Sequence, residues 1–333
     1  MDLNRDNYYT PEADMEYMSC SQFQAFEACE AAALAKLQGR WQDEPSEAFL
    51  VGNYFHSAME GEEAHAQFCE ENESAIYKTR VVKGKGGLPD SVVITGKKAP
   101  YEQADMMLEA AHKDALIQSL IDMPGENEKI MTGQIWGVPW RIRVDKYIES
   151  GRMIVDWKTV ANIGELKWSD KYHEKVTFIE AYDYMMRAAV YSEIEKQNAG
   201  SEDDPNFVIV AISKQDPPDK EVLLLNHRTR YDFELELIGK KLPYFQAIKE
   251  GRMKPKRCGT CPYCRATKKL YEIRPYYSLM PEYRGEPEDD YAADFRTGEA
   301  VADAQAEGSM EPVPTMSEPG GVGETVGRQV DAV

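Results

Sequence analysis

Two neighbouring apolar stretches of the chain each end in charged residues. Residues 140–145 read WRIRVD, in which large apolar residues alternate with charged ones, as in a strand with one buried face. After a short turn, residues 153–160 read MIVDWKTV, an apolar run that ends with Asp156, Trp157 and Lys158. Because side chains alternate along a strand, Asp156 and Lys158 are expected on one face and Trp157 on the other.

An antiparallel hairpin between these strands would gather two carboxylates and an amine at one edge of a sheet. Asp145 ends the first strand and would then lie alongside Asp156. Two carboxylates held together repel each other unless a cation separates them, and Mg²⁺ or Mn²⁺ prefers such oxygen ligands. Lys158 could then position or deprotonate water, or neutralise charge on a phosphate. The alternative is a structural salt bridge at the end of a strand.

The segments around this hairpin predict an α/β domain. Apolar spacing and capping residues indicate helices at residues 19–37, 46–61, 101–121, 178–197 and 230–251. Two further strands are expected at residues 207–213 and 221–227, joined by the loop KQDPPDK. This order of elements predicts a mixed central β-sheet flanked by helices.

Composition divides the chain into three parts. Residues 281–333 hold thirteen acidic residues against three arginines and few large apolar ones, so a disordered acidic tail is expected. Residues 1–16 are polar and are expected to be flexible, which leaves residues 17–280 as the folded domain. No run of eighteen apolar residues indicates a membrane span. The start of the chain is unlike a signal peptide, so a cytoplasmic protein with reduced thiols is expected.

A cysteine cluster stands near the end of the predicted domain. Cys258, Cys261 and Cys264 form C-x₂-C-x₂-C among basic residues. Three thiols so close together in a reducing compartment indicate a metal site, and a closed site needs a fourth ligand. Cys29 and Cys20, on the first predicted helix, are the candidates.

The paired aspartates and the lysine resemble the PD-(D/E)xK nuclease superfamily, and RecB-like members in particular. LVGNYFHSAMEG resembles their G-x-x-x-H helix, which contains Gly52 and His56 here. Their Q-x-x-x-Y motif is matched by Tyr191, with Arg187 in place of the Gln. Three segments look like exodeoxyribonuclease VIII (RecE-type) nuclease-like domains, so that the resemblance covers about residues 17–272: SQFQAFEACEAAALAKL, YEQADMMLEAAHKDALI and RCGTCPYCRATKKL.

The resemblance implies a metal-dependent DNA exonuclease that acts on linear duplex ends, in phage recombination or DNA repair, with a single-strand annealing partner. Homo-oligomers also occur among related exonucleases. Mg²⁺ or Mn²⁺ would be bound by His56, Asp145, Asp156 and the backbone carbonyl of Trp157, and Lys158 would activate the attacking water. Gly52 would permit close packing. Further substrate contacts are expected from Glu60, Arg187, Tyr191, Lys254, Lys256 and Arg257.

The resemblance extends to the cysteines. AddB-type helicase–nucleases and CRISPR adaptation nucleases join a first-helix cysteine to three C-terminal cysteines through a [4Fe–4S] cluster. The same order here favours Cys29 as the fourth ligand of such a cluster, with Cys20 as its competitor. Zn²⁺ is the alternative metal, because four thiolates also suit a structural zinc site.

Two rival functions use the same residues. The first is a catalytically inactive DNA-binding or scaffold protein on a nuclease fold, favoured by Arg187 and by the formal net charge of −19. The intact set of Asp145, Asp156 and Lys158 disfavours it. The second is a zinc-containing adaptor in which the aspartate pair is structural.

Overall fold

The computed structural model describes residues 1–83 and 90–280. The chain divides into two compact units, Met1–Ala266 and Thr267–Val333. In the second unit the described part contains the short 3₁₀ helix η2 (Tyr276–Leu279). The predicted acidic tail, residues 281–333, lies outside the described residues.

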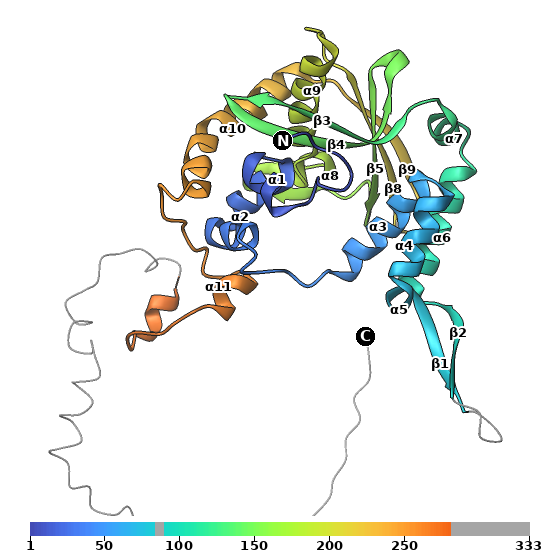
Figure 1. The fold of residues 1–333 in the computed structure, drawn as a ribbon, viewed down its shortest axis with the longest axis horizontal. Coiled ribbons are helices and arrows are strands. Elements are labelled where there is room, and N and C mark those ends of the chain that lie inside the picture. The colour runs from blue at the N-terminus through green and yellow to red at the C-terminus, as the bar shows by residue number, and fades with distance from the viewer. Residues whose placement is uncertain (84–89, 281–333) are drawn as a thin grey trace, which may run out of the picture. The chain divides into compact units, whose positions relative to one another are not determined.

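A five-stranded mixed sheet forms the centre of the first unit, in the order β3–β4–β5–β8–β9 (Figure 1). Its strands are β3 (Glu126–Ile135), β4 (Val138–Ile148), β5 (Met153–Val160), β8 (Asn206–Ser213) and β9 (Lys220–Leu225). β5 and β8 are parallel, and the other neighbouring pairs are antiparallel. The mixed α/β class predicted from the sequence is confirmed.

Helices cover both faces of this sheet (Figure 1). One face packs on α2 (Cys20–Leu37), α9 (Tyr184–Ala199) and α10 (Arg228–Lys249). The other face packs on α3 (Glu47–Glu60), α6 (Ala99–His112) and α7 (Ala115–Asp122). Trp140 of β4 is buried in the first core and Trp157 of β5 in the second. Within β5, consecutive residues Ile154 and Val155 also belong to different cores, as strand alternation requires. Among the described residues, no helix combines the length and apolarity that crossing a bilayer requires.

Two predicted helices are each divided into two. The predicted helix at residues 101–121 is divided into α6 and α7. Asp114, just after α6, caps α7 by accepting hydrogen bonds from the backbone N–H groups of Leu116 and Ile117. The predicted helix at residues 178–197 begins as α8 (Phe178–Ala181), and Asp183 then takes a left-handed conformation (φ 56°) before α9. A polar side chain tolerates that conformation better than a branched one does.

Several short elements were not predicted. They include α4 (Glu62–Glu71), α5 (Glu73–Ile76), β1 (Tyr77–Val82), β2 (Ser91–Lys97), η1 (Glu149–Gly151), β6 (Lys167–Ser169), β7 (Glu174–Val176) and α11 (Pro262–Ala266). β1 and β2 pair antiparallel and extend away from the helices as a separate hairpin (Figure 1). Their residues are mostly exposed, so the buried-face alternation that reveals core strands is missing from them.

The N-terminal residues are packed, which corrects the prediction that residues 1–16 are flexible. They include α1 (Pro11–Glu16), which Thr10 caps by accepting a hydrogen bond from the backbone N–H of Ala13. Tyr8 is buried, and the guanidinium of Arg141 lies 4.6 Å from the centre of its ring. The Lys249 ammonium donates to the carbonyl of Asp14 at 3.0 Å. Partners far along the chain therefore order a polar segment.

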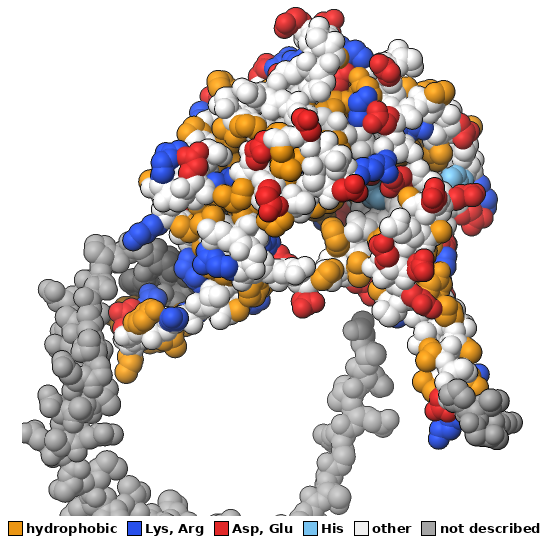
Figure 2. All heavy atoms as spheres, viewed as in Figure 1, with side chains coloured by type: hydrophobic (Ala, Val, Ile, Leu, Met, Phe, Trp, Pro, Cys, Tyr) orange, Lys and Arg blue, Asp and Glu red, His pale blue; other side chains and the backbone are white. Residues whose placement is uncertain are grey.

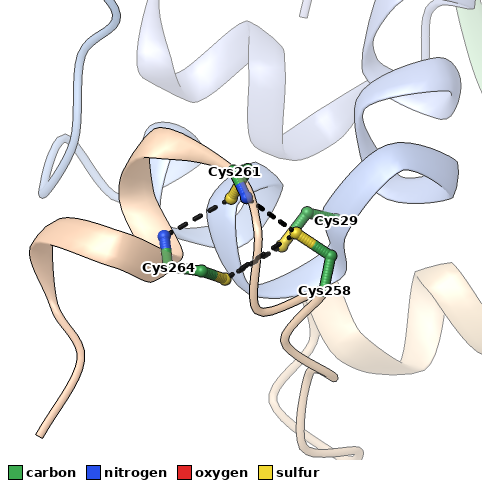
Figure 3. A group of neighbouring side chains, drawn as sticks. All are labelled: Cys29, Cys258, Cys261 and Cys264. Atoms are coloured by element: carbon green, nitrogen blue, oxygen red, sulfur yellow. Dashed lines mark hydrogen bonds between the residues drawn. The ribbon is translucent and has the colours of Figure 1, made fainter. Parts of the chain in front are cut away.

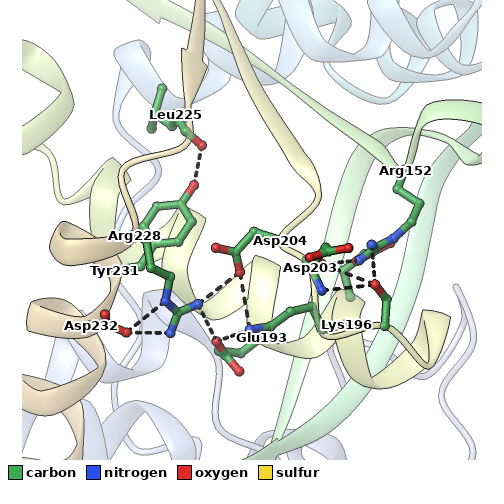
Figure 4. A network of polar contacts seen from close by, with 11 residues as sticks. Arg152, Glu193, Lys196, Asp203, Asp204, Leu225, Arg228, Tyr231 and Asp232 are labelled. Atoms are coloured by element: carbon green, nitrogen blue, oxygen red, sulfur yellow. Dashed lines mark hydrogen bonds and ion pairs between the residues drawn. The ribbon is translucent and has the colours of Figure 1, made fainter.

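A polar network fixes the loop between α9 and β8 (Figure 4). Arg228, at the start of α10, lies 3.0 Å from both Glu193 of α9 and Asp204 of the loop. Arg152, just before β5, donates to the Ser201 hydroxyl at 2.6 Å. The loop is therefore tied both to α10 and to the start of β5, which holds β5 and β8 side by side.

Candidate active site and cysteine cluster

The catalytic candidates lie where β4 and β5 separate. These strands pair only from Ile148 opposite Met153 to Lys146 opposite Val155. Beyond that point, the Oδ2 atom of Asp145 accepts a hydrogen bond from the backbone N–H of Trp157 at 2.9 Å. The carboxylate thus satisfies a backbone donor that has lost its partner in the neighbouring strand.

Lys158 joins the two carboxylates. Its ammonium lies 2.6 Å from Oδ2 of Asp156 and 3.9 Å from Oδ2 of Asp145. Asp156 is only 3% exposed, and a carboxylate so buried is costly unless a cation accompanies it. Lys158 also donates to the carbonyl of Trp157 at 3.0 Å, the oxygen that was predicted as a metal ligand.

Helix α3 brings His56 to the same place. Its Nδ1 atom lies 3.3 Å from Oδ2 of Asp145. Burial lowers the pKa of His56, and the nearby Asp145 only partly opposes this, so a neutral imidazole is favoured. Burial raises the pKa of Asp145, but the neighbouring cations, Lys158 and Arg187 among them, and the Trp157 N–H outweigh it and hold that pKa below its ordinary value. An ionised carboxylate and a neutral imidazole are the forms that bind metals.

These side chains open into a cavity of about 830 Å³, whose lining includes His56, Asp145 and Lys158. The predicted substrate contacts Glu60, Arg187 and Tyr191 line it too. Arg187 donates to the Tyr191 hydroxyl at 3.1 Å, and that hydroxyl donates to the carbonyl of Arg143, also at 3.1 Å. Arg187 therefore sits beside the aspartates as a fixed positive charge.

Sequence reasoning missed Glu128, which also lines the cavity. It lies in β3 between Asn127 and Lys129, whose partners in β4 flank Asp145. Burial raises the pKa of Glu128 to about 7; Arg143 opposes this effect, and Asp145 adds to it. The Arg143 guanidinium lies 2.6 Å from its carboxylate. Pairing WRIRVD with the preceding strand across the Trp136–Gly137 turn could have placed this acid opposite Asp145.

Further expectations concern residues that do not line this cavity. Lys254, Lys256 and Arg257 are not among the described residues that line the cavity. Arg257 instead donates to the carbonyl of Cys264 at 2.9 Å, beside the cysteine cluster. The expectation that Gly52 permits close packing is wrong, because a Cβ atom added there would meet nothing within 4 Å.

The structure gathers four cysteines, Cys29, Cys258, Cys261 and Cys264, with all four sulfur atoms within 4.8 Å of one another (Figure 3). Cys29 Sγ lies 3.6 Å from Cys264 Sγ, and none of the six cysteines of the chain is in a disulfide. The α2 helix departs from helical geometry at Cys29. Cys20, the competing fourth ligand, lines the cavity instead.

Backbone donors point at these sulfur atoms. The N–H of Cys261 donates to Cys258 Sγ at 3.3 Å, and the N–H of Cys264 donates to Cys261 Sγ at 3.4 Å. Hydrogen bonds from Cys261 and Thr260 lower the pKa of Cys258 to about 6, so its thiolate prevails at neutral pH. Removal from water raises the pKa of Cys261 to about 12, which a bound cation would reverse. This set of donors suits a thiophilic metal.

A mixed sheet with two aspartates and a lysine at the point where two strands part defines a PD-(D/E)xK nuclease fold. The chain belongs to the family described as "PDDEXK-like domain of unknown function", whose model matches residues 19–267. A nuclease fold implies a nucleic-acid substrate, and the predicted superfamily is confirmed.

One solved structure points the same way. The crystal structure of a Eubacterium rectale protein described as "Putative exonuclease" is 32% identical, with a TM-score of 0.73, and the match covers 84% of this chain and 99% of that chain. Another crystal structure, of SSO0001, matches with 12% identity over 79% of this chain and 98% of that chain. Its TM-score is 0.23, too low to support an argument. No curated protein matches the sequence.

Proposed function

We propose that the protein is a metal-dependent deoxyribonuclease that hydrolyses phosphodiester bonds at the ends of linear duplex DNA. The observation that carries this proposal is the convergence of His56, Asp145 and Lys158 in one cavity, with the buried carboxylate of Asp156 paired to Lys158 beside it. A purely structural salt bridge between these aspartates and Lys158 would need neither a histidine from a distant helix nor an open cavity beside the pair.

The donor set fits a divalent cation of the Mg²⁺ or Mn²⁺ type. Asp145 and Asp156 offer carboxylate oxygens and His56 a neutral nitrogen, while the Trp157 carbonyl could join them if Lys158 released it. Such an ion, when bound, offsets charge on the phosphate and lowers the pKa of water. Lys158 would hold the attacking water, and Arg187 would contact a phosphate oxygen.

We further propose that Cys29, Cys258, Cys261 and Cys264 bind a structural metal that joins α2 to the segment after α10. Resemblance favours the [4Fe–4S] cluster. The sulfur spacing supports the zinc alternative, because four sulfurs at about 2.3 Å from one tetrahedral ion lie about 3.8 Å apart. The observed separations of 3.6 Å and 3.9 Å are close to that value.

The biological setting is proposed from resemblance alone. A cytoplasmic exonuclease of phage recombination or DNA repair would supply single strands to an annealing protein, and it could act as a homo-oligomer. The rival proposal is an inactive DNA-binding or scaffold protein. It is favoured by Arg187, which replaces the Gln of the family motif, and by the net charge of −19.

One assay separates these functions. Purified protein is incubated with end-labelled linear duplex and with closed circular DNA, in Mn²⁺ or Mg²⁺ and then in EDTA. We expect the linear DNA to be degraded only with metal, and Asp156→Ala and Lys158→Ala to abolish degradation. Survival of linear DNA with the parent protein would refute the enzyme, and cutting of closed circles would identify an endonuclease instead.

A further inference from the structure

The connection between α2 and α3 crosses one side of the catalytic cavity. We call residues 38–46 the strap. Lys36 and Leu37, which precede the strap, and Phe49, which follows it, all line the cavity. Figure 2 shows an opening between the strap and the body of the molecule, at the place where Figure 1 shows α2 and α3 standing apart. The strap therefore bridges this side of the cavity between two elements that line it, while residues 38–46 are not themselves among the described residues of the lining.

The strap is held at both ends. The Trp41 ring packs edge-on against Tyr263, next to the cysteine cluster, with the ring centres 5.5 Å apart. Its indole N–H donates to Asp43 at 2.8 Å. At the far end, Ser46 caps α3 by accepting a hydrogen bond from the backbone N–H of Phe49 at 3.2 Å. These contacts define one path for the strap.

The cavity has the size of a short stretch of single-stranded nucleic acid. Cavities of about 300–1,000 Å³ enclose drug-sized ligands, so a cavity of about 830 Å³ has room for a few nucleotides of one strand. Tyr9 and Phe49 line it from different elements and remain 65% and 59% exposed. Exposed aromatic rings beside cationic side chains suit a single strand, because its bases stack on the rings and its phosphates pair with the cations. Arg187 supplies such charge here, and so does Lys36, which in this structure is paired with Asp43 of the strap.

We propose that the strap makes the cavity an aperture through which a single DNA strand threads by its free end, with Tyr9 and Phe49 stacking on its bases. This inference rests on the proposed nuclease function and specifies its substrate as an unpaired strand end. A duplex end would have to fray before one strand entered. A strand without a free end could not enter while the strap is intact.

Binding tests threading without cleavage. An Asp156→Asn variant of the full chain is titrated, in EDTA and in Ca²⁺, into a fluorescent single-stranded oligonucleotide biotinylated at both ends. We expect tight binding to the bare oligonucleotide. We expect at least about 10-fold weaker binding when streptavidin blocks both ends beforehand, and intermediate or unchanged binding when it blocks one end. Equal affinity for the doubly blocked strand would overturn the proposal.

Opening the strap provides the second test. A protease site is inserted between Asp43 and Glu44 in the full chain, and the strap is cut after purification. The cut protein should bind the doubly blocked oligonucleotide as well as the bare one. If the cut protein binds the bare oligonucleotide but still rejects the blocked one, the strap is not the barrier and the proposal is wrong. If cutting unfolds the protein, the blocked-end titration of the intact chain decides alone.

The aromatic residues are tested by substitution. Tyr9→Ala and Phe49→Ala should each weaken single-strand binding about 5- to 150-fold, whereas Tyr9→Phe should retain it. Leu116→Ala is the control, because Leu116 also lies in the first turn of a capped helix and is 58% exposed. Affinity unchanged in both alanine variants would refute stacking.

The two proposals can fail separately. If the protein cleaves linear DNA but binds doubly blocked strands as well as bare ones, the proposed nuclease function holds and the threading proposal is wrong. If binding requires a free end but no metal-dependent cleavage occurs, the threading proposal holds and the nuclease function is wrong.

Discussion

The carboxylate of Asp145 accepts the backbone N–H of Trp157 through the same oxygen, Oδ2, that faces His56 and Lys158. One atom therefore ends the strand pairing and belongs to the candidate metal site. These two roles can be separated, because an amide oxygen can still accept the N–H bond but is a poorer ligand than a carboxylate.

Asp145→Asn and Asp145→Ala test this separation. Both should lower metal-dependent cleavage by more than about 100-fold, because loss of a ligand costs at least as much as loss of its supporting partners. Only the alanine leaves the Trp157 N–H without its acceptor, so it should be less stable than the asparagine by about 1–3 kcal/mol. Urea unfolding in EDTA measures this difference. Equal stability of the two variants would show that the hydrogen bond does not hold the strands.

Lys158 and Asp156 form a buried ion pair, and a bound metal should restore the stability that is lost when Lys158 is replaced. Lys158→Met leaves the Asp156 carboxylate uncompensated, which should lower the unfolding free energy in EDTA by about 3–5 kcal/mol. Saturating Mn²⁺ supplies a replacement cation, so it should stabilise this variant more than it stabilises the parent. Lys113→Met is the control, since its ion pair with Glu109 is exposed and should contribute under about 1 kcal/mol. Equal stabilisation of parent and Lys158→Met by Mn²⁺ would count against the site.

Glu128 gives a pH dependence with a defined sign. Its pKa is raised to about 7 in the folded state, so the folded protein binds more protons than the unfolded one between about pH 4.5 and 7. The unfolding free energy should therefore fall as the pH rises through that range. Residue 128 cannot ionise in the Glu128→Gln variant. Relative to that variant, the unfolding free energy of the parent should be lower by about 3 kcal/mol at pH 7–8 and almost unchanged near pH 4.5.

Denaturant unfolding at several pH values in EDTA measures the Glu128 effect. Glu126→Gln serves as the control, since Glu126 lies in the same strand with a side chain that is 61% exposed. A difference between Glu128→Gln and the parent that does not change with pH would show that Arg143 keeps Glu128 ionised throughout.

The cysteine cluster is tested with two cysteines of the same helix. Cys29 and Cys20 are both buried in α2, but only Cys29 belongs to the sulfur group. Cys29→Ser should lose most of the bound metal and several kcal/mol of stability, whereas Cys20→Ser should keep its metal. Anaerobic purification with iron, sulfide and zinc analysis measures both. A colourless parent with one zinc would exclude the iron–sulfur cluster, and retention of metal by Cys29→Ser would exclude Cys29 as a ligand.

The central sheet and its two aspartates could be predicted because local signals mark them. Alternation in WRIRVD and the apolar run before Asp156 specify buried strands, and a short turn restricts how they pair. Glu128 and Tyr9 escaped prediction for the opposite reason. Each is a polar or exposed residue whose role comes from a distant partner, Arg143 in both cases. The strap carries no periodic pattern at all, so only the positions of α2 and α3 show what it crosses.

Two helical glycines should respond oppositely to alanine. Gly239 in α10 faces Trp136, whose ring would lie 2.8 Å from an added Cβ, and Trp136 is pinned by its bond to the carbonyl of Leu235. Gly239→Ala should therefore destabilise the protein by about 1–3 kcal/mol. Gly52 in α3 has open space around it, so Gly52→Ala should gain about 0.8–1.0 kcal/mol from helix propensity alone.

Thermal and urea unfolding of the two alanine variants measure this contrast. A stabilised Gly239→Ala would mean that Trp136 moves aside easily, so the turn that carries it would not be fixed on α10. A destabilised Gly52→Ala would mean that α3 packs more closely than the open space around Gly52 indicates. Gly52 lies one turn before His56, so the cleavage activity of the Gly52→Ala variant shows whether DNA occupies the open space beside Gly52. If the variant is more stable than the parent but no longer cleaves DNA, the substrate lies against α3.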